Sequence, residues 1–177
     1  MERVISKGDK IKYKCLRSGV CCRSGPNVAL TAFDVCRIAR FLGVEWRRLI
    51  GSYIYAVIAD HIPIPVLRGV NGRCVFLEVI NGVPSCRIYP ARPRRCRLFP
   101  FIPLSPSITD RVRVSSICPG IGEGEESEPP WSELERYSEE VKAHYKLLYD
   151  YIFTRGYEPL DALEAVIDFV CSQHHSL

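Results

Sequence analysis

The chain has 177 residues, of which 47% are hydrophobic and 25% are charged, a composition that excludes a disordered or fibrous chain and predicts one compact globular domain. No apolar stretch approaches the roughly 18 residues of a membrane-spanning helix, and the first residues lack the apolar segment of a secretory signal. We therefore expect a soluble, cytoplasmic protein without a membrane partner. Nine cysteines are the most unusual feature of the composition.

Charge is distributed unevenly along the chain. Residues 1–113 hold 20 Lys and Arg against 7 Asp and Glu, a net charge of +13, whereas residues 114–177 hold 4 against 13, a net charge of −9. The basic part also carries seven of the nine cysteines. Most of its cations are Arg, whose forked donors suit it either to neutralise a thiolate cluster or to bind phosphate. Both interpretations stay open.

The first predicted elements are a loop and a helix. Residues 14–27 mix Cys, Gly, Ser and Pro without periodicity, which indicates a loop. Thr31 is the predicted N-cap of the next helix, Asp34 completes a capping pair three residues later, and Gly43 is the stop signal. A second short helical stretch is expected at residues 44–50.

Residues 60–90 are expected to form a small antiparallel meander. The pairs Asn71-Gly72 and Asn81-Gly82 separate β-rich stretches, which is typical of hairpins. The prolines between residues 90 and 106 argue against regular structure there. A strand is predicted within residues 110–117, and residues 118–130 are expected to be a loop.

Two helices are predicted after this loop. Apolar residues at spacings of three and four indicate a long amphipathic helix from Pro130 to Gly156 and a last helix at about residues 159–171. The predicted fold class is therefore α+β. A small, irregular, metal-stabilised cysteine-rich region with short β-hairpins, residues 1–126, precedes a C-terminal helical hairpin, residues 127–177, packed on it within one structural domain.

Seven of the nine cysteines fall in predicted loops or beside turns. Thiolates that bind a metal must converge from segments able to bend around it, which turn backbone allows. We therefore expect these seven to be candidate metal ligands: Cys15, Cys21, Cys22, Cys74, Cys86, Cys96 and Cys118. The other two, Cys36 and Cys171, lie at apolar helix positions and are expected to pack in the core. A disulfide framework is less favoured because cytosolic thiols usually stay reduced.

The spacing of the cysteines bears on the kind of metal. Adjacent side chains such as those of Cys21 and Cys22 suit a polynuclear cluster better than one ion, and the Cys-x2-Cys spacing of zinc fingers is absent. Cys118 is followed by proline, as is the last ligand of ferredoxin-type motifs. The pattern favours an iron–sulfur cluster of the 4Fe-4S type as cofactor, with zinc as the alternative.

Arginines cluster around two of the candidate ligands, Cys86 and Cys96. Nearby cations lower the pKa of a thiol and offset the negative charge of a thiolate cluster. The alternatives are a solvated basic face and a patch for phosphate or nucleic acid. The arginines concerned are Arg87, Arg92, Arg94, Arg95 and Arg97.

Several motifs in a fixed order resemble the YkgJ-type cysteine-cluster family, a zinc- or iron-chelating domain whose relatives include flagellin lysine N-methylase. The likeness runs from about Lys14 to Gly124 through KCLRSGVCCR, LTAFDVCRIARFLG, CVFL, CRIYPARPRRCRLFPF and CPGIGEG. It implies that the same seven cysteines chelate the metal. Ser18 stands where the family's opening Cys-x2-Cys-x2-Cys-Cys motif has its second cysteine, so the chain offers seven ligands instead of eight.

Three functions follow as hypotheses. The first is a metal-binding protein that holds an iron–sulfur cluster and acts in redox or group-transfer chemistry as an iron–sulfur oxidoreductase. The second is a zinc-stabilised, non-enzymatic module whose basic part binds nucleic acid or an acidic partner. The third, implied by the resemblance alone, is protein-lysine methyl transfer. The sequence identifies no catalytic residue, and we expect the histidines, His144 among them, to have surface or packing roles.

Overall fold

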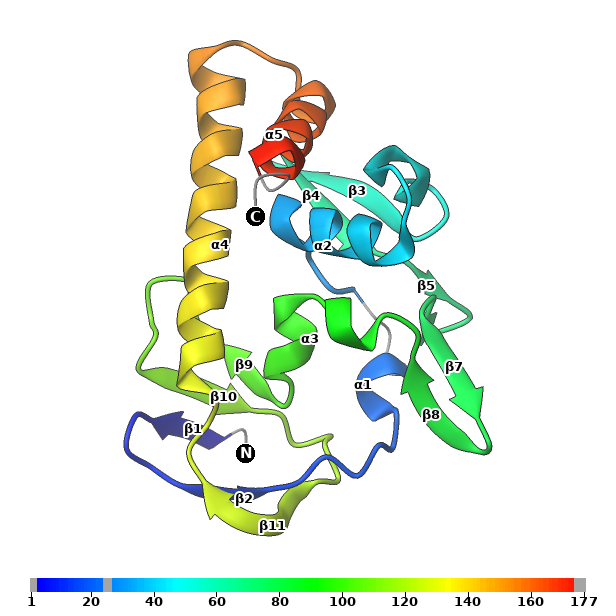
Figure 1. Cartoon of the computed structure of the whole chain (residues 1–177). Coiled ribbons are helices and arrows are strands. Elements are labelled where there is room, and N and C mark those ends of the chain that lie inside the picture. Colours follow the sequence, from blue (N-terminus) through cyan, green and yellow to red (C-terminus); the bar gives the residue numbers. More distant parts are fainter. Residues whose placement is uncertain (1–2, 24–26, 174–177) are drawn as a thin grey trace.

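The structure, a computed structural model, describes residues 3–23 and 27–173 of the chain and has an α+β fold (Figure 1). Short antiparallel strands make up 28% of the chain and helices 39%. The long helix α4, Trp131–Tyr149, runs along one side of the molecule, and the hairpins of residues 69–86 lie on the opposite side (Figure 1). This confirms the predicted fold class. None of the helices in the described ranges is long and apolar enough to cross a membrane.

Helix α2, Ala32–Leu42, begins and ends as the sequence predicts. The Thr31 hydroxyl accepts a hydrogen bond from the Asp34 N–H at 3.2 Å, and the Asp34 carboxylate accepts one from the Thr31 N–H at 3.0 Å. Gly43 has φ of 65° and ends the helix in the left-handed conformation. The 3-10 helix η1, Trp46–Leu49, follows as the expected short helical stretch.

Three two-stranded hairpins follow instead of one meander. The Asn71-Gly72 and Asn81-Gly82 turns have positive φ at both residues, between 50° and 78°, as tight hairpins require. A third turn, at Asp60 and His61, has the same conformation without an Asn-Gly signal. The pairs are β3 (Ile54–Ala59) with β4 (Ile62–Leu67), β5 (Gly69–Val70) with β6 (Arg73–Cys74), and β7 (Leu77–Ile80) with β8 (Val83–Cys86).

Two further sheets form at the other end of the molecule. Strand β10, Arg111–Val114, lies where a strand was predicted and pairs on both sides, in the order β1-β10-β9, with β1 (Arg3–Ser6) and β9 (Phe101–Pro103). Strand β11, Ile121–Ser127, pairs with β2, Ile11–Tyr13. The loop predicted for residues 118–130 is therefore wrong. Six of the seven β11 residues are exposed, so no apolar alternation marks the strand.

Three short helices occupy segments that were predicted to be irregular. Helix α1, Val20–Arg23, lies within the cysteine-rich loop, whose residues 24–26 are outside the described part of the chain. The 3-10 helix η2, Tyr89–Ala91, and helix α3, Arg94–Leu98, lie within the proline-rich segment. Proline does not prevent α3 because Pro93 is its N-cap, a position that needs no helical N–H donor.

The predicted C-terminal helical hairpin is present. Helix α4 continues into a π-helical turn, η3, Asp150–Thr154, and α5 spans Pro159–Gln173. Two hydrophobic clusters lie along α4. One joins α2, α5 and the β3–β4 hairpin, with Leu148 of α4. The other packs the β1-β10-β9 sheet and α3 against Trp131 and Leu134.

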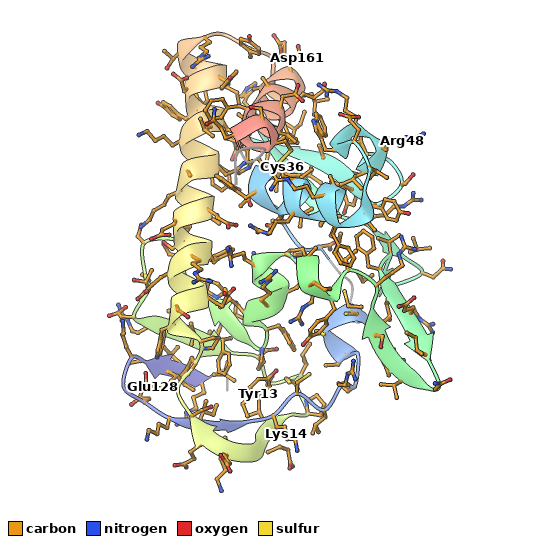
Figure 2. All side chains as sticks on the ribbon, in the orientation of Figure 1. Tyr13, Lys14, Cys36, Arg48, Glu128 and Asp161 are labelled. Atoms are coloured by element: carbon orange, nitrogen blue, oxygen red, sulfur yellow. A yellow bond between two sulfur atoms is a disulfide. The ribbon has the colours of Figure 1, made fainter. Side chains whose placement is uncertain are left out.

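A disulfide joins Cys36 of α2 to Cys171 of α5, with the two Cα atoms 5.4 Å apart (Figure 2). Cys36 is buried in the core and Cys171 is partly buried against it, as expected, but the bond between them was not expected. Each lies on the apolar face of its helix, and those faces pack against each other, so the two thiols meet. The periodicity of apolar residues indicates which face of each helix is buried, but it does not indicate which two helix faces pack together.

We expect the Cys36→Ala/Cys171→Ala double variant to be less stable by about 2–5 kcal/mol, because a crosslink over 135 residues restricts the unfolded chain. Urea unfolding of the metal-free protein measures this loss. The wild-type protein treated with a reductant serves as the control, and it should match the variant. Equal stability of variant and oxidised wild type would contradict the prediction.

His144 connects α4 to the start of α2. Its side chain is 1% exposed, and Nδ1 accepts a hydrogen bond from the Ala32 N–H at 3.2 Å. Its Nε2 is buried and has no hydrogen-bond partner within residues 3–23 and 27–173. Burial lowers the pKa of His144 to about 4, so the imidazole is neutral and serves as an acceptor at the helix N-terminus.

This predicts a specific pH dependence. The pKa of His144 is about 4 in the folded protein and about 6.5 in an unfolded chain, so its contribution to stability is full above pH 6.5 and is lost as the pH falls toward 4. The loss amounts to about 3 kcal/mol. Chemical denaturation of the metal-free protein at several pH values measures it. His144→Asn keeps an acceptor for Ala32 but does not titrate. Between pH 6.5 and pH 4 its free energy of unfolding should therefore fall by about 3 kcal/mol less than that of the wild type.

Candidate metal centre

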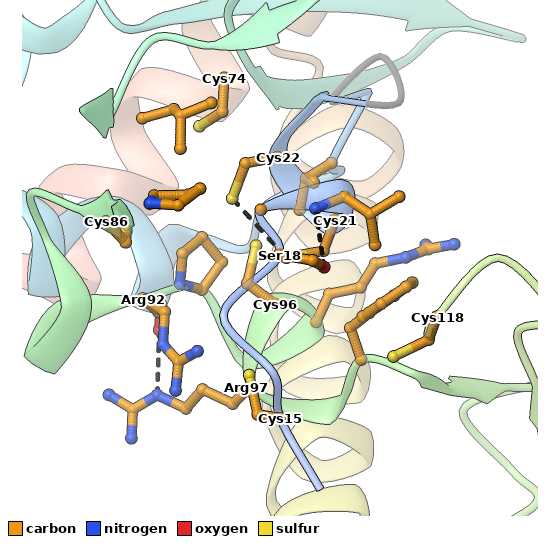
Figure 3. A pocket seen from close by; sticks show the side chains of 18 of the residues that line it. Cys15, Ser18, Cys21, Cys22, Cys74, Cys86, Arg92, Cys96, Arg97 and Cys118 are labelled. Carbon is orange, nitrogen blue, oxygen red and sulfur yellow. Dashed lines mark hydrogen bonds between the residues drawn. The ribbon is translucent and has the colours of Figure 1, made fainter. Parts of the chain in front are cut away.

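All seven candidate ligands line one cavity of about 420 Å³ (Figure 3). They come from α1, from the segment before it, from β6, β8 and α3, and from the turn before β11. All seven are free thiols. Segments that are far apart in the sequence thus contribute sulfur atoms to the same wall.

Backbone pairing brings Cys15 and Cys118 to one end of this cavity. Strands β2 and β11 pair with Tyr13 opposite Ile121, and the Lys14 N–H donates to the Gly120 carbonyl at 3.0 Å. A Cβ at Gly120 would lie 2.0 Å from the Lys14 carbonyl oxygen. Only glycine allows the two segments to approach this closely, so the glycine after Cys118-Pro119 is a structural requirement of the site.

Helix α1 carries Cys21 and Cys22 and packs against the β7–β8 hairpin. Gly19, with φ of 72°, lies so close to Pro84 that a Cβ would be 2.7 Å from the Pro84 Cβ. The Cys22 N–H donates to the Gly19 carbonyl at 3.0 Å, which starts the helix. The two Sγ atoms of the adjacent cysteines lie 3.7 Å apart. A single helical turn therefore presents both thiols to the cavity.

The two short hairpins position Cys74 and Cys86. Cys74 ends β6 and is buried, whereas Cys86 ends β8 opposite Leu77. The Arg87 N–H donates to the Phe76 carbonyl at 2.9 Å, which ties the end of β8 to the segment after Cys74. The Phe76 ring is buried and stacks on the Tyr53 ring with centroids 4.9 Å apart.

Cys96 lies on α3, and a group of partly buried ion pairs holds this helix in place. Glu140 of α4 accepts hydrogen bonds from Arg37 at 2.7 and 2.8 Å and from the Arg94 Nε at 2.8 Å. Asp34 accepts from the side chain of Arg37 and from the Arg94 N–H, the latter at 3.1 Å. Asp34 therefore has the capping role predicted for α2 and also binds the first turn of α3.

The pKa of Glu140 reflects this arrangement. Burial alone raises the pKa, but the hydrogen bonds and positive charges of Arg37 and Arg94 outweigh it and lower the pKa below its usual range. Glu140 is therefore a charged acceptor that joins α2, α3 and α4. Its two arginine partners have no more than 23% of their side chains exposed.

The arginines near the cysteines divide into two groups, which corrects the expectation that five of them surround the thiols. Arg87 and Arg94 do not line the cavity: the first lies over the Tyr53 and Phe76 rings, and the second binds Glu140 and Glu133. The arginines that do line it are Arg17, Arg92, Arg95 and Arg97. Arg17 comes from the cysteine-rich segment and was not among the arginines singled out from the sequence.

The thiols differ in acidity. Burial raises the pKa of Cys74, Cys86, Cys96 and Cys118. Cys21 is the exception, because a hydrogen bond from Cys22 lowers its pKa to about 6, while the pKa of Cys22 rises. Most of the thiols are thus protonated in the metal-free protein, and metal binding has to displace their protons.

The thiols also influence one another across the cavity. In addition to burial, Cys86 raises the pKa of Cys74, Cys74 and Cys86 raise the pKa of Cys96, and Cys15 and Cys21 raise the pKa of Cys118. In the part of the chain that the structure describes, no three His, Cys, Asp or Glu side chains meet in an arrangement that could hold a metal ion. The thiols line the cavity wall at different places and do not converge on one point.

Two aromatic residues of the wall were not identified from the sequence. The Tyr13 ring packs edge-on against Phe101, with centroids 5.4 Å apart, at the end of the cavity near Cys15 and Cys118. Burial raises the pKa of Tyr13, and the neighbouring thiolates raise it further. The alternation of apolar residues in Ile11–Tyr13 was the available signal, but three residues are too few for periodicity to predict a strand.

A wall of seven thiols without a carboxylate or histidine among the lining residues is the donor chemistry of a soft-metal-binding protein. The chain belongs to the CxxCxxCC family, whose model is described as "Putative zinc- or iron-chelating domain" and matches residues 14–119, more than half of the chain. This confirms the resemblance to the cysteine-cluster family. These thiols are chemically suitable ligands for either zinc or iron.

One similar curated protein is an uncharacterized protein of Methanocaldococcus jannaschii. It is 33% identical over 91 residues, which are 51% of this chain and 46% of that relative. The match thus spans about half the length of the relative. No solved structure matches the chain.

We expect Glu140→Ala to destabilise the protein by about 1–3 kcal/mol, because it removes the carboxylate that the partly buried Arg37 and Arg94 share and leaves them with Asp34 and Glu133, respectively, as their remaining carboxylate partners. Urea unfolding measures the loss. The matched control is Glu139→Ala, which removes the exposed neighbouring carboxylate on α4 and should change stability by less than about 0.5 kcal/mol. Similar losses in the two variants would show that the ion pairs do not hold α3.

Proposed function

We propose that this protein binds an iron–sulfur cluster of the 4Fe-4S type through its cavity thiols and acts in electron transfer or group transfer. The observation that carries the proposal is the wall of seven free thiols, drawn from five separate segments, around one cavity of about 420 Å³. The family match supports chelation of iron or zinc. The choice of a cluster over a single ion is our inference.

Two features favour a cluster. The sulfur atoms line a wide cavity, whereas a single zinc ion needs four ligands within about 2.3 Å of one point. The adjacent Cys21 and Cys22 thiols are 3.7 Å apart, and a polynuclear centre can use both. We propose the group Cys22, Cys74, Cys86 and Cys96 as the principal ligands. Cys15, Cys21 and Cys118 line the same wall and remain candidate ligands.

The remaining wall residues have roles that do not depend on the identity of the metal. Arg92, Arg95 and Arg97 place positive charge beside the thiols and offset the charge of four thiolates. Phe76 and Phe101 are buried and keep water from the inner wall. When bound, an iron–sulfur cluster supplies one-electron transfer, which neither the thiols nor the arginines can provide.

A zinc-stabilised module that binds nucleic acid or an acidic partner is the second candidate. The four arginines of the wall and the absence of any acidic lining residue favour it, since they present positive charge at the cavity. Methyl transfer to protein lysine and a cytoplasmic location stay predictions from the sequence, and no contact among the described residues favours either.

Anaerobic purification followed by elemental analysis, absorption spectroscopy and EPR tests the proposal. We expect iron and inorganic sulfide in equal amounts, brown protein and a cluster signal in the reduced state. Cys74→Ser and Cys96→Ser should lose most of the iron, whereas the Cys36→Ala/Cys171→Ala variant, which changes no cavity thiol, should keep it. Stoichiometric zinc without iron after anaerobic reconstitution would favour the second candidate instead.

Removal of the metal should lower the melting temperature, because ligands from separate segments close long loops only when a metal is bound. Hydrogen exchange should rise first in α1, in the β7–β8 hairpin and at the Cys118 turn, whose contacts to the rest of the molecule are few. The α2–α5 region, which the disulfide holds, should change least. An unchanged melting temperature after chelation would contradict this coupling.

A further inference from the structure

The cavity wall carries positive charge and has no carboxylate among its lining residues. Its lining residues include four arginines but no Asp, Glu or Lys. Several arginines elsewhere are paired: Arg37 and Arg94 bind Glu140, and Arg47 binds Asp168 at 2.6 Å. Among the described residues no salt bridge involves any of the four cavity arginines. Exposed arginines such as Arg48 also have none, but the cavity arginines differ from them because they lie beside the thiols.

Two of these cations, Arg92 and Arg97, are fixed in position by backbone carbonyls. Arg97 donates through Nη2 to the Pro90 carbonyl at 2.6 Å and through Nε to the Arg92 carbonyl at 3.1 Å. Arg92 donates through Nε to the Tyr89 carbonyl at 3.3 Å, and its guanidinium lies 3.7 Å from the centroid of the Tyr89 ring. Figure 3 shows the two guanidinium groups close together at the edge of the cavity. Neither side chain is fully exposed.

The thiols alone do not account for this charge. A centre in which four thiolates bind a divalent ion or an oxidised four-iron core has a net charge of about −2. The four arginines supply more positive charge than such a centre carries. Arg17 and Arg95 are exposed to solvent, whereas Arg92 and Arg97 are half-buried and form no salt bridge within the described residues. Guanidinium groups that are fixed and only partly hydrated bind carboxylate and phosphate oxygens strongly.

We propose that Arg92 and Arg97 form an anion-binding subsite in this cavity, which takes a small molecule with a carboxylate or phosphate group. The charged group pairs with the two guanidiniums, and the uncharged remainder lies against apolar wall residues such as Leu16, Phe99 and Ile102. The proposal goes beyond the proposed function because it holds for either metal and for the metal-free protein.

A small molecule fits these observations better than a nucleic-acid strand. Both guanidinium groups belong to a concave wall, and both already donate hydrogen bonds to backbone carbonyls. The N–H groups that remain are few and lie close together, which suits a single anionic group. A nucleic-acid backbone instead requires a row of accessible cations along a surface.

Calorimetric titration of inorganic phosphate, and separately of butyrate, into metal-loaded and metal-free protein tests the subsite. We expect saturable binding of at least one anion, and the anion that binds identifies the charged group of the natural ligand. The Arg92→Gln/Arg97→Gln variant should bind it at least about tenfold more weakly, since it loses charge-assisted hydrogen bonds. Arg48→Gln removes an exposed arginine that does not line the cavity and should bind as wild type does.

A second measurement uses wild-type protein only, in case the double variant does not fold. Phenylglyoxal modifies accessible arginines, and peptide mass spectrometry locates the products. The bound anion should protect Arg92 and Arg97 but not Arg48. No saturable binding of either anion, equal binding by the double variant, or single-stranded RNA binding that neither anion inhibits would each overturn the proposal. Loss of metal in the double variant without anion binding to wild type would show that the arginines serve only the thiolates.

These outcomes separate the subsite from the metal centre. Anion binding to protein that contains zinc, or no metal at all, would support the subsite while the iron–sulfur proposal fails. Iron–sulfur protein that binds neither anion would overturn the subsite and leave the proposed function standing.

Discussion

The position of α3 depends on two carboxylates that lie far from it in the sequence. Glu140 of α4 and Asp34 of α2 bind Arg94 at the first turn of α3, and both also bind Arg37. Charged groups that are partly buried require partners, so the three helices cannot separate without leaving a charge uncompensated. The thiol of Cys96 and the cavity arginines of the same segment therefore have a fixed support, although α3 itself has only five residues.

The rest of the cavity wall has weaker support. Strands β5 to β8 form two-stranded sheets, and β2 pairs with β11 alone. Such small sheets have little stability in isolation. Single glycines set the closest approaches, at Gly120 against Lys14 and at Gly19 against Pro84. The helix α3 is thus held firmly, whereas the two-stranded sheets that carry the other thiols are not. This contrast explains why the thiols lie apart around the cavity and how a metal can draw them together.

The sequence was sufficient for elements whose signals are local. The capping residues of α2, the Asn-Gly turns and the periodicity of α4 and α5 are all readable within a few residues, and the seven loop cysteines stand out by position. Signals that depend on distant partners could not be read. Strand β11 pairs through its backbone, Arg94 differs from Arg97 only because Glu140 lies beside it, and Cys36 meets Cys171 only when two helices pack.

The disulfide between Cys36 and Cys171 has a topological consequence for assembly of the site. It closes a covalent ring that contains Cys74, Cys86, Cys96 and Cys118, while Cys15, Cys21 and Cys22 lie on the arm that precedes the ring. In the oxidised protein the ring limits how far its four sulfur atoms can drift from one another, whereas the three thiols of the arm depend on the pairing of β1 with β10 and of β2 with β11 to stay beside the ring. Delivery of a metal to such a chain can start on the ring and finish with the thiols of the arm.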